Sequence, residues 1–231
     1  MTKLLLLIGL NLFWVSVHAI TVEELLVKVN ESNKGVLSYN TTYLLFKGHD
    51  VQQAYNRYSG YYYQGDGQVY QKIKEMELVY AKDFFIKLNS EEKEMTITDP
   101  QNLPTNSYNP QNTLKYSQDN SLEDKGSFYL VTVNYLQKPN VPLSHLSMKI
   151  SKEYELLEIE MFYRQVQNFA KKRGEQDFSV PRLKIIFEEI DHRKEREELF
   201  EQSKYFIQKG NAIQPAAGYS GFVVIDNRTK K

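Results

Sequence analysis

This chain of 231 residues contains few of the residue patterns that are typical of catalytic or metal sites. There is no cysteine, which excludes thiolate catalysis, disulfides and every zinc site that needs sulfur. Beyond residue 19 the histidines are His49, His145 and His192, and none lies at metal-ligand spacing from another. No G-x-S-x-G, H-E-x-x-H or phosphate-binding glycine loop occurs. We therefore predict no catalytic residue, no metal and no cofactor.

Carboxylates are numerous, so pairs of them arise by chance. Glu158 and Glu160 share one face of a predicted strand, but alternation places that face away from the apolar side. A pair of acids that hydrolyses a substrate would need two carboxyl groups converging in a cleft. The sequence therefore favours a protein that is not an enzyme.

The overall charge argues against binding to nucleic acid. Lysine plus arginine number 29, and aspartate plus glutamate also number 29. A chain without net charge lacks the positive field that holds proteins on phosphate backbones. We expect no nucleic-acid partner.

The first 19 residues have the pattern of a cleavable signal peptide. Lys3 precedes an apolar run from Leu4 to Val17, and Val17-His18-Ala19 places small residues where a signal peptidase cleaves. The run is shorter than the roughly 20 residues that span a bilayer, and no later run approaches that length. We expect a periplasmic monomer, with an extracellular location as an alternative, whose residues 20–231 form a single domain without a transmembrane segment.

The elements that position the remaining side chains follow from two periodicities. Thr21 and Glu24 form a capping box before a short helix with apolar residues on one stripe. From Leu37 the period changes to two, which is typical of strands with one buried face. Predicted strands are Leu37–Phe46, Ala54–Gln64, Gln68–Ile73, Met76–Tyr80, Phe84–Asn89, Glu94–Thr98, Ser127–Tyr135, Leu146–Ser151, Leu156–Tyr163 and Arg182–Ile190, with Phe222–Ile225 as an edge strand.

The pattern predicts a mainly β (α+β) fold: an incomplete antiparallel β-barrel or strongly curved sheet. The short N-terminal helix, with a helix or loop, would cover the open side. Two segments fit no strand. Residues 99–126 contain three prolines and predict a flap or a poorly patterned helix, and residues 165–180 predict a solvated loop with the basic triplet Lys171-Lys172-Arg173.

Apolar residues that alternate with polar ones along the strands are the candidates for lining a ligand cavity. A saturated chain would gain about 0.8 kcal/mol for each buried CH₂. The same residues would form an ordinary core if the sheet packed against its helix. The candidates are Phe84, Ile86, Leu88, Met95, Ile97, Met148, Ile150, Leu157, Ile159 and Met161.

The 17 tyrosines have two interpretations. They crowd the first two strands, and Tyr61, Tyr62 and Tyr63 must occupy both faces of the sheet because they are consecutive. Strand propensity and cross-strand aromatic pairs would explain them without a ligand, whereas an amphipathic lining would keep hydroxyl groups hydrated beside an acyl chain or peptide. Their concentration in the first hairpin favours packing at the rim of the sheet.

The order of parts resembles the LolA/LolB-type periplasmic lipoprotein carriers. The resemblance lies in the signal peptide, the capped helix, the strand that ends at Gly60, and Leu183–Ile190 followed by Phe200. It implies an incomplete antiparallel barrel closed by helices over a hydrophobic cavity. In that family a proline and an arginine that holds the lid follow the glycine; here Tyr61 follows Gly60 and Arg57 precedes it, so the lid arginine has no counterpart.

Two functions remain open at this point. The first is an exported carrier that binds a lipid, an acyl chain or a lipoprotein non-covalently in a half-barrel cavity. The alternative is an envelope or secretion-system accessory module whose sheet edge or 99–126 segment binds a protein partner. A continuous apolar void beneath the N-terminal helix would favour the carrier, and a filled interior would favour the interaction module.

Overall fold

The computed structural model describes residues 20–101, 110–138, 140–170, 172, 174–210 and 212–229. The predicted signal peptide and residues 102–109 of the predicted flap lie outside these ranges. Strands account for 51% of the structure and helices for 13%.

The elements follow one another along the chain as a helix, a long series of strands and a short mixed tail. The helices are α1 (Val22–Ser32) and α2 (Gln202–Tyr205), with 3₁₀ turns η1 (Pro110–Tyr116), η2 (Glu197–Leu199) and η3 (Ala217–Tyr219). The first strands are β1 (Leu37–Phe46), β2 (Asn56–Gly65), β3 (Gln68–Ile73), β4 (Met76–Tyr80), β5 (Phe85–Asn89), β6 (Glu94–Thr98), β7 (Ser117–Asp124) and β8 (Phe128–Tyr135). The later strands are β9 (Leu143–Ser151), β10 (Leu156–Tyr163), β11 (Gln167–Asn168), β12 (Phe178–Ser179), β13 (Arg182–Asp191), β14 (Phe206–Lys209), β15 (Ala212–Pro215) and β16 (Val223–Asp226).

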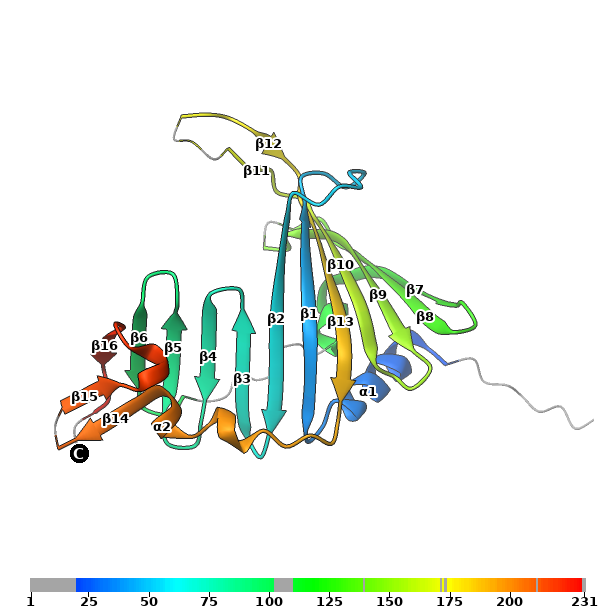
Figure 1. The fold of residues 1–231 in the computed structure, drawn as a ribbon. Coiled ribbons are helices and arrows are strands. Elements are labelled where there is room, and N and C mark those ends of the chain that lie inside the picture. The colour runs from blue at the N-terminus through cyan, green and yellow to red at the C-terminus, as the bar shows by residue number, and fades with distance from the viewer. Residues whose placement is uncertain are drawn as a thin grey trace, which may run out of the picture.

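One twelve-stranded sheet dominates the molecule, in the order β16-β6-β5-β4-β3-β2-β1-β13-β10-β9-β8-β7. All neighbours pair antiparallel except β16, which runs parallel to β6. The sheet curves strongly and does not close, because β16 and β7 remain at its two ends (Figure 1). The predicted incomplete, curved antiparallel sheet is confirmed.

The helix α1 forms where its capping signals lie. The Thr21 hydroxyl accepts a hydrogen bond from the Glu24 amide, and the Glu24 carboxylate accepts one from the Thr21 amide, so two exposed amides at the helix start are satisfied. Val22, Leu25, Leu26 and Val29 are all buried. The predicted helix and its apolar stripe are confirmed.

The first hairpins are fixed by glycines. Asp66 and Gly67 both have positive φ, which a tight two-residue turn between β2 and β3 requires. At Gly60, in the middle of β2, an added Cβ would lie 2.5 Å from Oγ1 of Thr41 and 2.8 Å from the carbonyl oxygen of Lys72. Only glycine therefore lets the neighbouring strands approach this closely.

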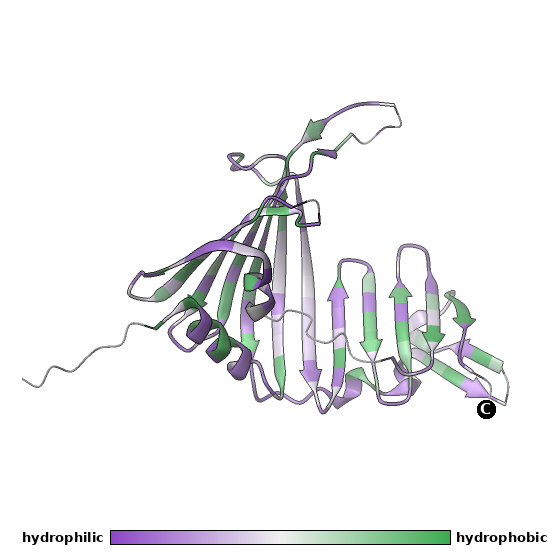
Figure 2. Cartoon of the chain, turned by 180° about the vertical axis from the view of Figure 1, so that it is seen from behind, coloured by the Kyte–Doolittle hydropathy of each residue, from purple (hydrophilic) through white to green (hydrophobic). Residues whose placement is uncertain are grey.

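The buried apolar residues form two clusters on opposite faces of this single sheet. Tyr62 and Tyr63 are adjacent in β2 and so point to opposite faces. Tyr63 belongs to the cluster under the C-terminal segment. Tyr62 stacks on Tyr39, and the ring of Tyr39 contacts Phe187, which packs against the cluster under α1. Figures 1 and 2 show α1 on one side of the sheet and the C-terminal segment on the other. We call these the helix-side face and the tail-side face.

Two segments differ from the predictions. Within the predicted flap or poorly patterned helix, residues 110–116 form the helical turn η1, but Ser117–Asp124 form the edge strand β7, which was not expected; β7 is polar and mostly exposed, so it shows no alternation of apolar and polar residues. Within the predicted loop 165–180 lies the two-stranded ribbon β11–β12. The expected edge strand near the C-terminus is confirmed as β16.

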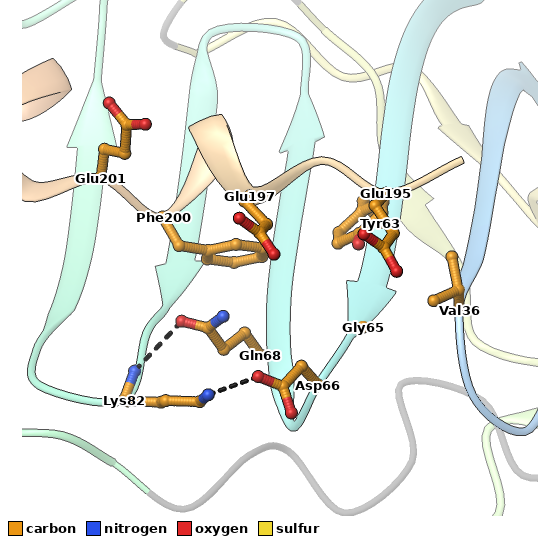
Figure 3. Close-up of a pocket in the computed structure, with 10 residues that line it drawn as sticks. All are labelled: Val36, Tyr63, Gly65, Asp66, Gln68, Lys82, Glu195, Glu197, Phe200 and Glu201. Carbon is orange, nitrogen blue, oxygen red and sulfur yellow. Dashed lines mark hydrogen bonds and ion pairs between the residues drawn. The ribbon is translucent and has the colours of Figure 1, made fainter. Parts of the chain in front are cut away.

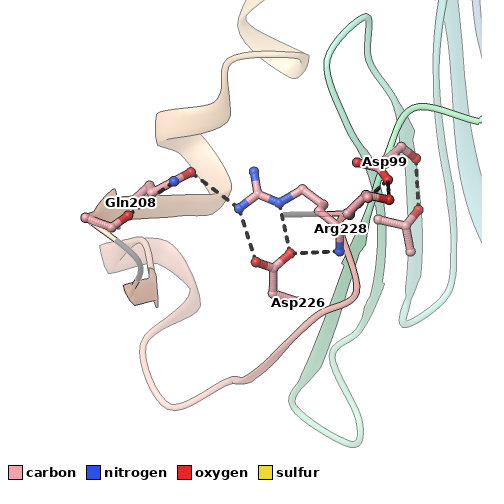
Figure 4. A network of polar contacts seen from close by, with 7 residues as sticks. Asp99, Gln208, Asp226 and Arg228 are labelled. Atoms are coloured by element: carbon pink, nitrogen blue, oxygen red, sulfur yellow. Dashed lines mark hydrogen bonds and ion pairs between the residues drawn. The ribbon is translucent and has the colours of Figure 1, made fainter. Parts of the chain in front are cut away.

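Polar contacts hold the C-terminal strand in place (Figure 4). Arg228 bonds Asp226 through Nε at 2.9 Å and Gln208 of β14 through Nη2 at 3.3 Å. The backbone amide of Thr229 donates to Asp99, just after β6, at 2.9 Å. The last residues of the described chain are thus tied to both β14 and β6.

Candidate functional site

The ten predicted lining residues do not face one common space. Five lie in the tail-side cluster: Phe84, Ile86, Leu88, Met95 and Ile97. Met148, Ile150 and Ile159 are buried in the helix-side cluster, and Met161 packs against it. The two groups lie on opposite faces of the sheet, so a single cavity cannot contain both.

Leu157 lies in neither cluster. The pairing register between β10 and β9 shifts between Leu156 and Glu158, and this bulge places Leu156 in the helix-side cluster. Simple alternation counted back from Ile159 therefore picks the wrong one of two adjacent leucines.

The C-terminal segment covers the tail-side cluster. Tyr205 and Phe206 are fully buried there, and Leu199 and Phe200 are 9% exposed. The ring of Phe206 meets that of Phe84 edge-on, with centroids 5.8 Å apart, and the hydroxyl of Tyr205 donates to the carbonyl oxygen of Leu199 at 2.6 Å. The tail-side cluster is therefore packed against the protein's own C-terminal segment.

On the helix-side face, apolar side chains continue past α1 across the central strands. Pairing aligns Ile159, Ile185, Tyr43 and Tyr58 in one row across β10, β13, β1 and β2. A second row aligns Met161, Leu183 and Leu45. Of these seven residues only Ile159 is buried. We call the six half-buried residues the apolar strip: Tyr43, Leu45, Tyr58, Met161, Leu183 and Ile185.

A small aromatic pocket lies at one end of this face, near the end of α1. Its volume is about 50 Å³, and Tyr39, Tyr62, Leu156 and Phe187 are among its lining residues. Burial raises the pKa of Tyr39 well above its usual value, so its hydroxyl stays neutral. A pocket of this size is much smaller than the roughly 300 to 1,000 Å³ of typical ligand sites.

The tail-side face also contains a buried carboxylate that sequence reasoning missed. Glu77 is 5% exposed; it accepts a hydrogen bond from the Tyr70 hydroxyl at 2.8 Å and pairs with Lys72 at 2.9 Å. Burial, and secondly the charge of Glu77, raises the pKa of Tyr70. Glu77 also lines a cavity of about 450 Å³ with Lys204, whose pKa is lowered by burial. The sequence offered one signal for Glu77. It lies two residues before Val79 in β4, so alternation places it on the same face as that buried residue.

An acidic pocket of about 580 Å³ lies where the β2–β3 turn meets the chain before α2 (Figure 3). Asp66, Glu195, Glu197 and Glu201 line it, and Tyr63 and Phe200 contribute aromatic surface. Lys82 is the basic residue among its lining residues and bonds Asp66, which raises the pKa of Lys82.

The carboxylates considered for hydrolysis are held by basic partners. Lys184 lies 2.7 Å from Glu158 and 3.6 Å from Glu160, and Arg182 lies 3.2 Å from Glu160. These four side chains form a charged ladder on the tail-side face of β10 and β13. No cluster of three or more potential metal ligands occurs within the described residues.

The fold brings two of the predicted histidines, His49 and His145, close to each other. His145 stacks on Phe162 with centroids 3.8 Å apart, and the ring of His49 lies 6.2 Å from that of His145. Burial, and secondly His49, lowers the pKa of His145. His192 lies apart, 3.4 Å from Glu155.

Comparison with known proteins gives similarity in structure alone. No protein-family model and no curated protein sequence matches the chain. The chain is similar to a crystal structure of a DUF1329 family protein from Desulfovibrio piger, with 10% identity, a TM-score of 0.36, and coverage of 78% of this chain and 96% of the other. It is also similar to a putative outer membrane lipoprotein-sorting protein domain from Vibrio parahaemolyticus, with 9% identity, a TM-score of 0.33, and coverage of 77% and 95%.

Proposed function

We propose that this protein is an exported, periplasmic carrier-like protein that binds a lipid or acyl chain non-covalently on the helix-side face. The observation that carries the proposal is the apolar strip. Its six side chains are half-buried, lie in register on four neighbouring strands and continue the helix-side cluster toward solvent.

The dimensions and chemistry of the strip suit an extended hydrocarbon chain. Three interstrand spacings from β10 to β2 give a width of about 14 Å. Leu45, Leu183, Ile185 and Met161 offer hydrocarbon surface, and Tyr43 and Tyr58 add rings with polar tips. Each buried CH₂ of a ligand would contribute about 0.8 kcal/mol, or roughly a fourfold gain in affinity. No catalytic group is needed for such binding.

The packed tail-side cluster has a structural role in this proposal. Its members are covered by the protein's own C-terminal segment. Of the predicted lining residues, Met161 belongs to the strip, and Ile159 lies at its buried end. Among the described residues, no helix has the length and apolar character to cross a bilayer.

Two adjacent isoleucines of β13 provide a matched test. Ile185 points to the helix-side face and Ile186 to the tail-side face, and both are half-buried. We expect Ile185→Ser to weaken binding of a fluorescent fatty-acid analogue about tenfold, because it places a hydroxyl against the chain. Ile186→Ser should bind like the unmodified protein.

Native mass spectrometry of protein purified from its own envelope adds an independent readout. A co-purified lipid-sized mass that is lost on extraction would support the carrier. Equal fatty-acid binding by the two variants would overturn the placement of the site. A ligand-free spectrum with protein partners retained would instead favour the interaction module.

A further inference from the structure

The tail-side face has a cavity that the proposed acyl-chain site does not use. Its volume is about 450 Å³, which falls within the roughly 300 to 1,000 Å³ of typical small-molecule sites. It lies where β4 and the end of β5 meet the C-terminal segment. We call it the tail-side cavity, and its lining residues are Glu77, Ser90, Lys204, Gly218, Tyr219 and Phe222.

The buried carboxylate of this cavity is already satisfied by the protein. Glu77 is 5% exposed. Its Oε2 accepts a hydrogen bond from the Tyr70 hydroxyl at 2.8 Å, and its Oε1 pairs with the ammonium of Lys72 at 2.9 Å. A ligand cation would have to compete with Lys72 for this carboxylate and would be repelled by Lys204. The cavity is therefore poorly suited to an amine.

Lys204 of α2 contributes a cation without a counter-ion. Its ammonium lies 5.6 Å from the ring centre of Tyr70 and 5.4 Å from that of Tyr205, and among the described residues it forms no ion pair. Glu198, an acid whose charge acts on Lys204, is itself paired with Arg196 at 3.2 Å. Burial lowers the pKa of Lys204, because an ammonium held away from water is harder to charge. A ligand carboxylate would supply the missing partner.

Charge and surface together define the class of ligand. Glu77, Lys72 and Lys204 leave one net positive charge beside the cavity, which favours an anion. The rings of Tyr219 and Phe222 meet edge-on with centroids 5.3 Å apart, so they offer an aromatic wall. We propose that the tail-side cavity binds a small aromatic carboxylate, whose anionic group pairs with Lys204 and whose ring packs on Tyr219 and Phe222.

This site is separate from the acyl-chain site. The apolar strip lies on the helix-side face, whereas Glu77 is in phase with Val79 of the tail-side cluster. A ligand in the cavity therefore does not touch the strip. Lys204→Gln should leave binding of the fluorescent fatty-acid analogue unchanged.

Isothermal titration calorimetry with benzoate tests the proposal. Benzoate should bind, and benzylamine, which carries the opposite charge on the same ring, should not. Acetate, which lacks the ring, should bind about tenfold more weakly than benzoate. Lys204→Gln should weaken benzoate binding about tenfold, because a charge-assisted hydrogen bond is lost, and Lys204→Arg should retain it because the charge is kept.

Glu77→Gln reports the charge of the preferred ligand through the sign of its effect. Glutamine still offers an oxygen to the Tyr70 hydroxyl but removes the negative charge, so benzoate should bind more tightly. A site for cations would lose affinity instead. Circular dichroism checks the fold of each variant, and the Lys204 variants test the proposal even if Glu77→Gln fails to fold.

Lys209 provides the matched control. It is exposed at the end of β14 and does not line the cavity, so Lys209→Gln should leave benzoate binding unchanged. Absence of benzoate binding by the unmodified protein, tighter binding of benzylamine, or an equal effect of Lys204→Gln and Lys209→Gln would overturn the proposal. Any of these results with fatty-acid binding intact would leave the carrier function standing.

Discussion

Phe206→Ala tests whether the C-terminal segment belongs to the core. The side chain is fully buried in β14, and its ring meets that of Phe84 edge-on at 5.8 Å. The guanidinium group of Arg228 lies 5.2 Å from the same ring. Removing the ring therefore leaves a cavity and breaks two aromatic contacts at once.

The expected loss of stability is large, although the sequence of this segment resembles a charged tail. Truncation of a buried phenylalanine costs about 3 to 5 kcal/mol. For a domain of this size, each kcal/mol lowers Tm by about 2 to 4 °C, so Tm should fall by about 6 to 20 °C. Phe84→Ala combined with Phe206→Ala should show a coupling of about 0.5 to 1.5 kcal/mol, because the two rings contact each other.

Urea unfolding followed by circular dichroism measures this change. Phe178→Ala is the control, since it removes a phenylalanine ring that is 60% exposed, and it should change stability by about 0.5 kcal/mol or less. If Phe206→Ala unfolds at the same urea concentration as this control, the packing of the C-terminal segment on the tail-side face is wrong.

Three further changes probe the rest of the fold. Leu25→Ala in α1, at a fully buried site, should cost about 2 to 5 kcal/mol and shift one single unfolding transition, whereas a second transition would contradict a single domain. Tyr70→Phe should cost about 1.5 to 3 kcal/mol in urea unfolding because Glu77 loses a 2.8 Å hydrogen bond, and an unchanged midpoint would refute this role. The pKa of His145 is lowered from 6.5 by burial and by His49, so as pH falls below about 6.5 the unfolded chain binds a proton first and stability declines. His145→Gln should reduce this decline in stability, which unfolding experiments across a range of pH would measure. An unchanged slope of stability against pH would argue against this role of His145.

Local patterns were enough to predict most of the sheet. The period-two alternation identified β1, β3, β4, β6 and β10 with their observed bounds. The alternation is a local signal, because a strand with one buried face alternates apolar and polar residues regardless of which strand it pairs with. The edge strand β7 was missed because it buries almost nothing and so does not alternate. Leu157 was misplaced because a bulge changes the phase, and no local signal marks a bulge.

The sequence by itself determined most of the secondary structure, the capped helix and the absence of cysteine chemistry, because each depends on residue type and near neighbours. Only the tertiary structure decided which apolar residues share a space. Alternation tells that Ile86 and Met148 are both buried, but the pairing register places them on opposite faces. It also decided that Phe206 covers the tail-side cluster, since that contact joins parts of the chain far apart in sequence. The twelve-stranded sheet has two faces. Which face is buried at each end of the sheet depends on the segment that packs against it, which is α1 at one end and the C-terminal segment at the other.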